Sequence, residues 1–423
     1  MFDYELMHRV SSHERSATDH YRQRRRRRST GEEPGTVGSV AHREHLYQSA
    51  VAIAREGGPA AGPDGVFPRE LTKTEISAGV FAAAECLRDG NYVPGEKRVV
   101  RIPKPAGGTR TIRVANFLDR VVSHAVTDRL AEYVVPEFSM ANYGHLGVAT
   151  LLADIKLAAE NSGQWVIAAA DIRKAFDTVP THLAFRELLE LARAHGLRVT
   201  GGAADDFWSL VRVILTAGMG HRIGIDQGCS LSPLALDALL TAYDDWIAET
   251  VQQNYPRGSL PIRTFRYVDN IYYLCSSKSQ GREVLREASK QLKDAGLTLG
   301  TASVHTVSRR RCLRVLGMWP VRSGDQLRYR IHEEVWTKLE AELHEVYLST
   351  QPHKLAWQIV QGRVAQLGPV IESEPDLLDR IQSILRRVGL REGFSRKRLE
   401  ESAESALTRW RALLDDRRAR REN

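Results

Sequence analysis

Residues 165–172, Trp-Val-Ile-Ala-Ala-Ala-Asp-Ile, decide the fold. A short apolar run that ends in a carboxylate is typical of a buried strand with an acid at its C-terminal end. A second stretch, residues 263–274 (Arg-Thr-Phe-Arg-Tyr-Val-Asp-Asn-Ile-Tyr-Tyr-Leu), predicts two strands joined by a tight turn. That turn would hold Asp269 and Asn270.

The segments around these strands complete a recognisable order. Helices are expected over 182–195, after Gln227-Gly228 and over 282–295, and a short strand over 315–318. The order β, α, α, β-turn-β, α, β is a split βαβ pattern, which forms one antiparallel sheet. The fold class is therefore α+β, and the sheet should bring Asp171 and Asp269 together.

The flanking segments have different patterns. Residues 99–104 and 110–114 enclose Pro-Ala-Gly-Gly and predict a β-hairpin, which a helix over 117–133 should follow. Residues 37–88 favour helices interrupted by a glycine and proline loop at 57–65, and everything beyond about residue 331 favours helices. The arginine-rich stretch at 22–40 is expected to be a flexible arm, either a solvated tail or a nucleic-acid contact.

Composition sets broader limits. The 423 residues carry a formal charge of +8, which suits a polyanionic partner but does not by itself demonstrate one. The four cysteines, Cys86, Cys229, Cys275 and Cys312, lie far apart and suit neither a zinc site nor a disulfide scaffold. No apolar run approaches a membrane span and no signal peptide is visible, so a cytoplasmic protein without a membrane partner is expected.

The chemistry follows from the two aspartates. Nucleotidyl transfer needs two divalent cations that clamp the attacking and leaving oxygens, and carboxylates at strand ends hold such hard cations. Asp171 and Asp269 are the candidates. Each alone is more typical of a cap or a turn, so the hypothesis depends on the ordered set of motifs.

That set resembles the reverse transcriptases of bacterial group II introns, retrons and related defence systems. Residues 62–65, 101–110, 118–122 and 143–145 are similar to the family's finger motifs. Residues 170–177 (Ala-Asp-Ile-Arg-Lys-Ala-Phe-Asp), 226–234 (Asp-Gln-Gly-Cys-Ser-Leu-Ser-Pro-Leu) and 267–270 (Tyr-Val-Asp-Asn) are similar to its palm motifs. Leu316-Gly317 falls where the family has its primer-grip hairpin.

The resemblance implies a role for each matching residue. Asp171, Asp269 and Asn270 form the catalytic set, with the metal ions held at Asp171, Ile172 and Asp269. Ile172 also belongs to the nucleotide site. Lys104 and Arg110 would grip the triphosphate, unless they are solvated hairpin charges. The nucleic-acid contacts would be Arg101, Arg113, Leu316 and Gly317.

Further roles concern the nucleotide. Gln227 and Gly228 would let the backbone approach nucleotide and template closely, unless they are an ordinary loop before a helix. The Phe176 ring would exclude a 2′-hydroxyl and favour deoxynucleotides, unless it belongs to the core. In the thumb, Lys354, Trp357 and Arg363 could track a duplex, unless their helix only packs.

Two departures from the family pattern matter. Asn270 replaces a second aspartate, and an amide is a poorer ligand for a hard cation. Either the Asp171 and Asp269 pair still holds both metals, or the fold binds nucleic acid without chemistry, or the site performs untemplated or protein-primed synthesis. The family's lysine after the helix at 282–295 is also missing, and one of the arginines at 309–311 could replace it.

The expected architecture is a right-hand polymerase with fingers, a ferredoxin-like palm and a helical thumb. Its expected parts are a basic arm at 1–45, fingers at 46–160, a palm at 161–325 and a helical thumb with a C-terminal helix at 326–423. The expected function is RNA-directed DNA synthesis, in bacterial antiphage defence, with two Mg²⁺ or Mn²⁺ ions per site. Its partners would be dNTPs, an RNA template or dedicated non-coding RNA, the DNA product, and a protein partner or a second copy. The alternatives are a polymerase-fold subunit that binds nucleic acid beside a partner, and a retron-type enzyme that primes from an RNA hydroxyl.

Overall fold

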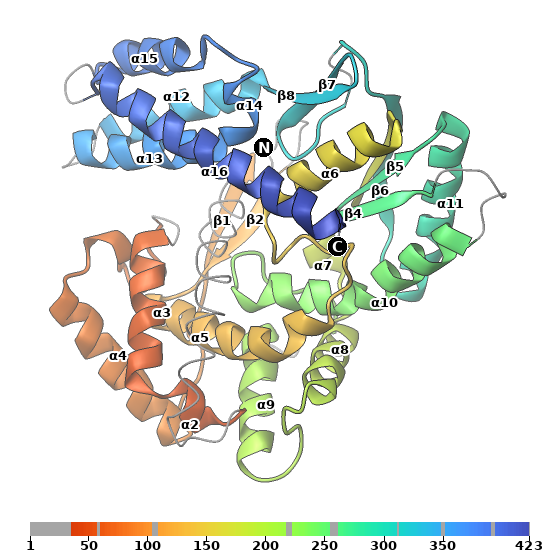
Figure 1. Ribbon diagram of the computed structural model, residues 1–423. Helices are drawn as coiled ribbons and strands as arrows, with labels where there is room; N and C mark the ends of the chain where they lie inside the picture. The colour runs from red at the N-terminus through yellow and green to blue at the C-terminus, as the bar shows by residue number, and fades with distance from the viewer. Residues whose placement is uncertain are drawn as a thin grey trace.

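The computed structural model describes residues 35–56, 60–103, 109–216, 222–253, 261–310, 313–347, 352–390 and 394–422 (Figure 1). The arginine run of the expected arm lies outside these residues, as do Lys104 and Arg311. The C-terminal end of the range expected for the arm instead belongs to the helices that the sequence predicts from residue 37. It forms helix α2 (Val37–Val40) and the start of α3 (Arg43–Glu56), with Val40 and Ala41 fully buried.

The centre of the molecule is a four-stranded antiparallel sheet in the order β4-β5-β3-β6. This is the order of a split βαβ, ferredoxin-like palm, so the expected α+β fold class is confirmed. The strand at 165–172 and the hairpin at 263–274 are where the sequence predicts them. The strands are β3 (Val166–Ile172), β4 (Arg263–Tyr267), β5 (Asn270–Cys275) and β6 (Leu299–Thr306).

The fourth strand of the sheet corrects the sequence prediction. It is β6, whereas the expected strand at 315–318 is a tight turn. Val315 and Met318 pair across this turn, and both central residues have positive φ, +45° at Leu316 and +87° at Gly317. Two central residues of positive φ characterise the type I′ turn that matches the twist of a hairpin.

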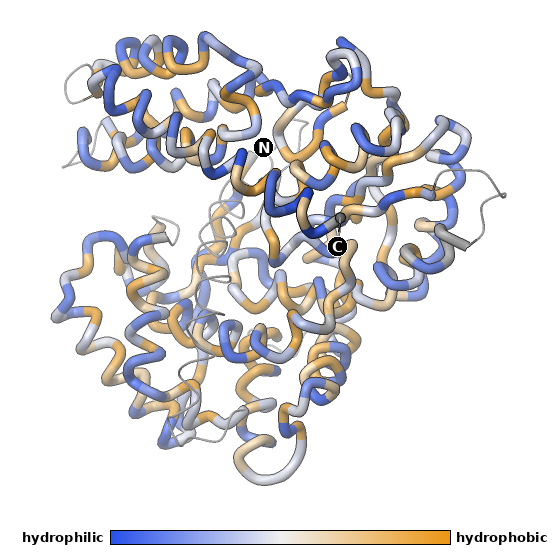
Figure 2. Tube along the Cα trace, in the orientation of Figure 1, coloured by the Kyte–Doolittle hydropathy of each residue, from blue (hydrophilic) through white to orange (hydrophobic). Residues whose placement is uncertain are grey.

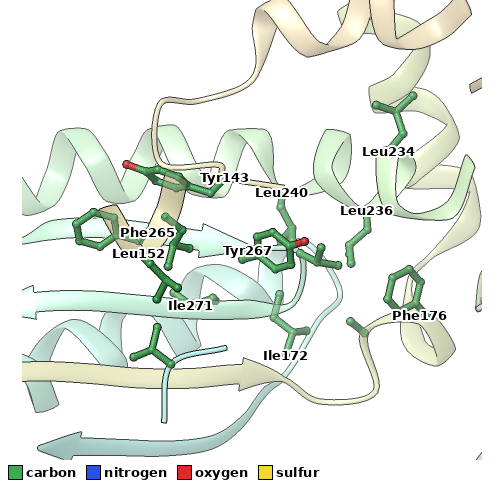
Figure 3. Close-up of a cluster of buried hydrophobic side chains, with 14 of the residues drawn as sticks. Tyr143, Leu152, Ile172, Phe176, Leu234, Leu236, Leu240, Phe265, Tyr267 and Ile271 are labelled. Carbon is green, nitrogen blue, oxygen red and sulfur yellow. The ribbon is translucent and has the colours of Figure 1, made fainter. Parts of the chain in front are cut away.

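Helix α11 shows how the sheet is covered. The Ser277 side chain caps its N-terminus, and its apolar stripe of Val284, Leu285, Ala288 and Leu292 is buried against β3, β5 and β6. Figure 3 shows part of the buried interior beside α10, with side chains from the sheet and from the helices in one apolar cluster. The helices that follow β3 along the chain are α7 (Ala175–Thr178), α8 (Thr181–Ala194), α9 (Ala203–Leu215), α10 (Leu231–Gln253) and α11 (Lys278–Asp294).

The N-terminal part of the described chain combines helices with the expected hairpin. The hairpin pairs Arg98 with Val114 at its open end and Pro103 with Thr109 at its turn end. A capping box of Thr72 and Glu75 starts α4. The elements here are η1 (Pro68–Glu70), α4 (Lys73–Arg88), β1 (Arg98–Pro103), β2 (Thr109–Val114), α5 (Phe117–Val134), η2 (Val135–Glu137) and α6 (Val148–Ser162).

The C-terminal part begins with a hairpin and continues as helices, along which hydrophilic and hydrophobic residues alternate (Figure 2). The expected palm boundary at residue 325 falls between the two strands of this hairpin. Arg363 is fully buried and bonded to Glu342, so it cannot track a duplex as the sequence suggested. The elements are β7 (Met318–Ser323), β8 (Gln326–Ile331), α12 (Glu333–Tyr347), α13 (Pro352–Gln366), α14 (Gly368–Ile371), α15 (Leu377–Val388) and α16 (Arg396–Glu422).

Helix α16 connects this helical part to the body of the molecule. Figure 1 shows it running from the C-terminal helices across α6. Arg417 near its end bonds both carboxylate oxygens of the buried Asp154 on α6, and Tyr143 donates a further hydrogen bond to that carboxylate. Within the described residues, no helix is both long and apolar enough to cross a membrane.

Candidate active site

The register of β3 and β5 brings the predicted acids together. Asp171 is the Cα partner of Asn270, and the backbone N–H of Ile172 donates to the carbonyl of Asp269 at 2.8 Å. Asp171 and Asp269 therefore lie on adjacent backbone segments at one end of the sheet. One detail differs from the sequence prediction: the turn consists of Val268 and Asp269, and Asn270 is the first residue of β5.

The turn before Asp269 is strained. Val268 has φ of +56°, a conformation that is uncommon for any residue other than glycine and a clear outlier for a β-branched one. Such a conformation costs on the order of 1–3 kcal/mol and persists only where surrounding contacts enforce it. The buried guanidinium of Arg266 supplies one such contact, because its Nη1 donates to the carbonyl of Val268 at 2.9 Å.

The Asp171 carboxylate rests on a glycine that the sequence reading did not single out. A Cβ at Gly300 would lie 2.7 Å from each Asp171 carboxylate oxygen. The next backbone N–H, that of Thr301, donates to Asp171 Oδ1 at 2.8 Å. Glycine inside a strand often marks such a close approach, so Gly300 was the available signal.

Asn270 orients its neighbour. Its side-chain Nδ2 donates to Asp269 Oδ1 at 2.9 Å. A second aspartate here would place two like charges side by side, whereas the amide adds a hydrogen bond and leaves its own carbonyl oxygen as a neutral acceptor.

The donor set fits a hard divalent cation. Asp171 and Asp269 offer carboxylate oxygens, and Ile172 could contribute only its backbone carbonyl, because its hydrocarbon side chain has no donor atom. Among the described residues, no group of three or more His, Cys, Asp or Glu is placed to hold a metal ion. Water and phosphate oxygens would have to complete the coordination, as is usual for Mg²⁺.

The Gln227-Gly228 loop docks on the hairpin of β1 and β2. Gly228 has φ of +107°, and a Cβ there would lie 3.1 Å from the carbonyl of Arg113. The Arg113 N–H points to the carbonyl of Gln227 at 3.4 Å, and its guanidinium bonds Asp226 at 3.0 Å. Lys97 also pairs with Asp226, so ion pairs that the sequence did not reveal join this loop to the hairpin.

The other predicted nucleic-acid residues are only partly placed. Arg101 is exposed on β1, and the Arg113 side chain remains 41% exposed despite its ion pair. Arg110 lies in β2 opposite Ile102, but its side chain is outside the description. The Leu316 N–H is 3.3 Å from the hydroxyl of Tyr272, a β5 residue close to Asn270, so the Leu316-Gly317 turn lies beside the acids.

Phe176 is buried, with 2% of its surface exposed, and belongs to the apolar cluster of Figure 3. A ring in this position could touch a nucleotide sugar only if its neighbours moved. Its role as a gate against the 2′-hydroxyl stays a prediction.

An antiparallel sheet of this order, with a pair of aspartates at one end, has the arrangement expected for the palm of a right-hand polymerase. The family profile for reverse transcriptase (RNA-dependent DNA polymerase) matches residues 102–319, about half of the chain. The chain belongs to this reverse transcriptase family.

Curated relatives are distant and longer. The chain is 27% identical over 181 residues to the COX1/OXI3 intron 1 protein of Saccharomyces cerevisiae, a match covering 41% of this chain and 21% of that protein. It is 25% identical over 207 residues to the intron 2 protein of the same yeast, covering 46% of this chain and 22% of that protein. The matches thus span about a fifth of the length of these relatives.

Two telomerases are among the solved structures that match the chain. The apo telomerase of Candida tropicalis gives a TM-score of 0.43 at 12% identity, over 74% of this chain and 62% of that chain. The telomerase of Candida albicans, in complex with a fragment of telomeric RNA, gives 0.39 at 11% identity, over 75% of this chain and 64% of that chain.

Proposed function

We propose that this protein is an RNA-directed DNA polymerase that extends a primer along an RNA template. The observation that carries the proposal is the placement of Asp171 and Asp269 on adjacent backbone segments at one end of the palm sheet, within a reverse transcriptase domain. Catalysis of phosphoryl transfer depends mainly on positioning and charge stabilisation. In this site, hydrogen bonds hold the carboxylates of both Asp171 and Asp269 in position.

Asp171 and Asp269, with the carbonyl of Ile172, would hold two Mg²⁺ ions, or Mn²⁺ in their place. When bound, the ions supply charge stabilisation for the attacking and leaving oxygens. The chain's own residues orient these ligands: Thr301 holds the Asp171 carboxylate, and Asn270 holds that of Asp269. This support for Asp269 favours the reading in which Asn270 accompanies an active site over the reading in which it marks lost chemistry.

The substrate contacts are proposed around that centre. Lys104 and Arg110 bind the triphosphate, Gln227 and Gly228 line the nucleotide and template, and Phe176 favours dNTPs over ribonucleotides. Arg101, Arg113, Leu316 and Gly317 contact the template and primer strands. Ion pairing of Arg113 with Asp226 supports this, because it keeps the hairpin of β1 and β2 next to the Gln227 loop.

The biological setting is proposed from the motif resemblance. It points to the reverse transcriptases of bacterial defence systems, which suggests antiphage synthesis guided by a dedicated non-coding RNA, with a protein partner or a second copy. The four dispersed cysteines suit a reducing, cytoplasmic compartment.

The experiment is primer extension by the purified protein on an RNA template of defined sequence. Each dNTP and each NTP is supplied with Mg²⁺ or with Mn²⁺. The proposal expects DNA whose sequence follows the template. Products that ignore the template would indicate untemplated or protein-primed synthesis, and DNA joined covalently to RNA would indicate retron-type priming.

A nucleic-acid-binding subunit without chemistry is the second candidate, favoured by the missing second aspartate at Asn270. It predicts RNA binding that weakens with salt and is unchanged by Asp171→Ala, together with no incorporation under any condition.

A further inference from the structure

Arg266 is a fully buried charged residue next to the catalytic turn, at 0% exposure on β4. Its guanidinium bonds two carboxylates of α10. Nε lies 2.8 and 2.9 Å from the two oxygens of Asp244, and Nη2 lies 2.6 Å from Asp244 Oδ2. Nη1 lies 2.5 Å from Asp237 Oδ1. A buried charge is tolerated only when paired in this way.

The same Nη1 donates to the carbonyl of Val268, and this bond fixes one side of Asp269. The carbonyl of Val268 and the N–H of Asp269 belong to one peptide plane, so holding the oxygen holds the plane. On the other side, the carbonyl of Asp269 accepts from Ile172. Both peptide planes that flank the metal-binding residue are therefore restrained, and one of them by a side chain.

The restraint acts from behind the site. Successive side chains in a strand point to opposite faces, so Arg266, which pairs with Ile271, lies on the face opposite Asn270 and Asp171. Its ion pairs to α10 lie on that rear face. Arg266 is therefore placed to act through the turn, and not on substrate or metal.

The backbone of Arg266 is restrained as well. Its N–H donates to the carbonyl of Ala141 and its carbonyl accepts from the N–H of Tyr143, both at 2.7 Å. Gly144 beside this segment leaves room for the network, because a Cβ there would lie 2.5 Å from Asp237 Oδ2. Arg266 is thus held both at its backbone and at its guanidinium, so it can oppose the strain at Val268.

We propose that Arg266 is a positioning residue that places Asp269 for metal binding. It does so by linking the carbonyl of Val268, a residue with a strained φ, to the two carboxylates of α10. This inference rests on the proposed function, because it explains the ion pairs of Arg266 by the metal site proposed above. The competing explanation is a purely structural ion pair. The two differ in what Arg266→Lys should do, because one ammonium cannot span Asp244, Asp237 and the Val268 carbonyl as the planar fork does.

The matched control is Arg363→Lys. Arg363 is also 0% exposed, and it donates to both carboxylate oxygens of Glu342 at 2.7 and 2.9 Å. It differs from Arg266 in belonging to α13 and not to the sheet. Mn²⁺ binding is titrated in the wild type, in both variants and in Asp171→Asn. The binding that Asp171→Asn loses is the binding at the proposed site. We expect Arg266→Lys to weaken the Asp171-dependent binding by about tenfold or more, because loss of a residue that orients a metal ligand typically costs about 10–100-fold in metal affinity. Arg363→Lys should stay within about twofold of the wild type, because Arg363 bonds Glu342 and orients no proposed metal ligand.

Primer extension provides a second readout. Arg266→Lys should lower the single-turnover rate constant by about 10–100-fold and leave the primer-template Kd unchanged. Val268→Gly, which removes the penalty for positive φ, should make the Arg266→Lys effect smaller, because less strain remains to be held. Should Arg266→Lys fail to fold, Asp237→Asn is measured in its place. It should also lower Mn²⁺ affinity and the rate constant, but by less.

The outcomes separate the two proposals. A wild type that binds Mn²⁺ through Asp171 but incorporates no nucleotide refutes the polymerase function, and the metal titration still decides the role of Arg266. Equal losses in Arg266→Lys and Arg363→Lys, or an Arg266→Lys effect unchanged by Val268→Gly, overturn the positioning role. No Asp171-dependent Mn²⁺ binding in the wild type overturns both.

Discussion

Gly300→Ala tests whether the Asp171 carboxylate needs its present place. The new Cβ would lie 2.7 Å from both carboxylate oxygens, and ordinary contact begins at about 3.4 Å, so the carboxylate must shift by about 0.7 Å. Misplacement of about 1 Å can lower a rate about 100-fold, so a loss of roughly 10–100-fold is expected. Folding should not suffer, because alanine in a strand interior is more favourable than glycine by roughly 0.5–1 kcal/mol.

The assay is single-turnover incorporation of one nucleotide, together with thermal unfolding. Gly281→Ala is the control, since a Cβ there would lie 2.8 Å from Val304 and 3.2 Å from Ala168 in the apolar contact between α11 and the sheet. It should lower stability and leave the rate constant of the folded protein near that of the wild type. A Gly300→Ala rate within threefold of wild type would refute the reasoning.

Three further changes have defined outcomes. Asn270→Asp adds a carboxylate to the proposed metal site, so incorporation with Mg²⁺ should be at least that of the wild type. A loss would mean that the hydrogen bond from Asn270 to Asp269 matters more than the added charge. Phe176→Ala should raise ribonucleotide incorporation relative to deoxynucleotide and, because the ring is buried, lower stability by about 3–5 kcal/mol; unchanged selectivity would remove the gate. Burial raises the pKa of Asp244 from 3.8 to about 6, although Arg266 opposes this rise. The folded protein therefore holds the Asp244 proton more tightly than the unfolded chain does. This proton binding stabilises the fold fully below pH 3.8, and the stabilisation is lost as pH rises through 6. Between these values the wild type should lose stability relative to Asp244→Asn by up to about 1.4 kcal/mol per pH unit in chemical denaturation, and parallel pH profiles would contradict this.

The sequence was most informative where local pattern and burial agree. The apolar run at 165–172 and the strand-turn-strand pattern at 263–274 predicted β3 and the hairpin of β4 and β5, and through them the proximity of Asp171 and Asp269. The strand β6 was not found, because Leu-Gly-Thr-Ala-Ser-Val-His-Thr is a partly exposed edge strand without an apolar run. The turn at Leu316 was read as a strand because leucine disfavours the positive φ that it adopts here.

Contacts between distant segments were the other limit. Arg266 lies 22 residues from Asp244 and 29 from Asp237 along the chain, and only the fold brings it to these acids behind the turn that holds Asp269. Two acids seven residues apart within the largely apolar helix α10 were the available signal, since acids are seldom fully buried without a partner. Gly300 likewise acquires its meaning from the carboxylate that lies against it.

The most direct test of the central claim is the single-turnover rate of template-directed incorporation in Asp171→Asn against Asp177→Asn. Asp177 lies in the same motif but is exposed, so its substitution controls for the loss of one nearby negative charge. The two-aspartate site predicts that Asp171→Asn loses at least about a thousandfold in rate while still binding RNA, because removing a ligand removes charge stabilisation at the reacting oxygens. Equal rates in the two variants would contradict it.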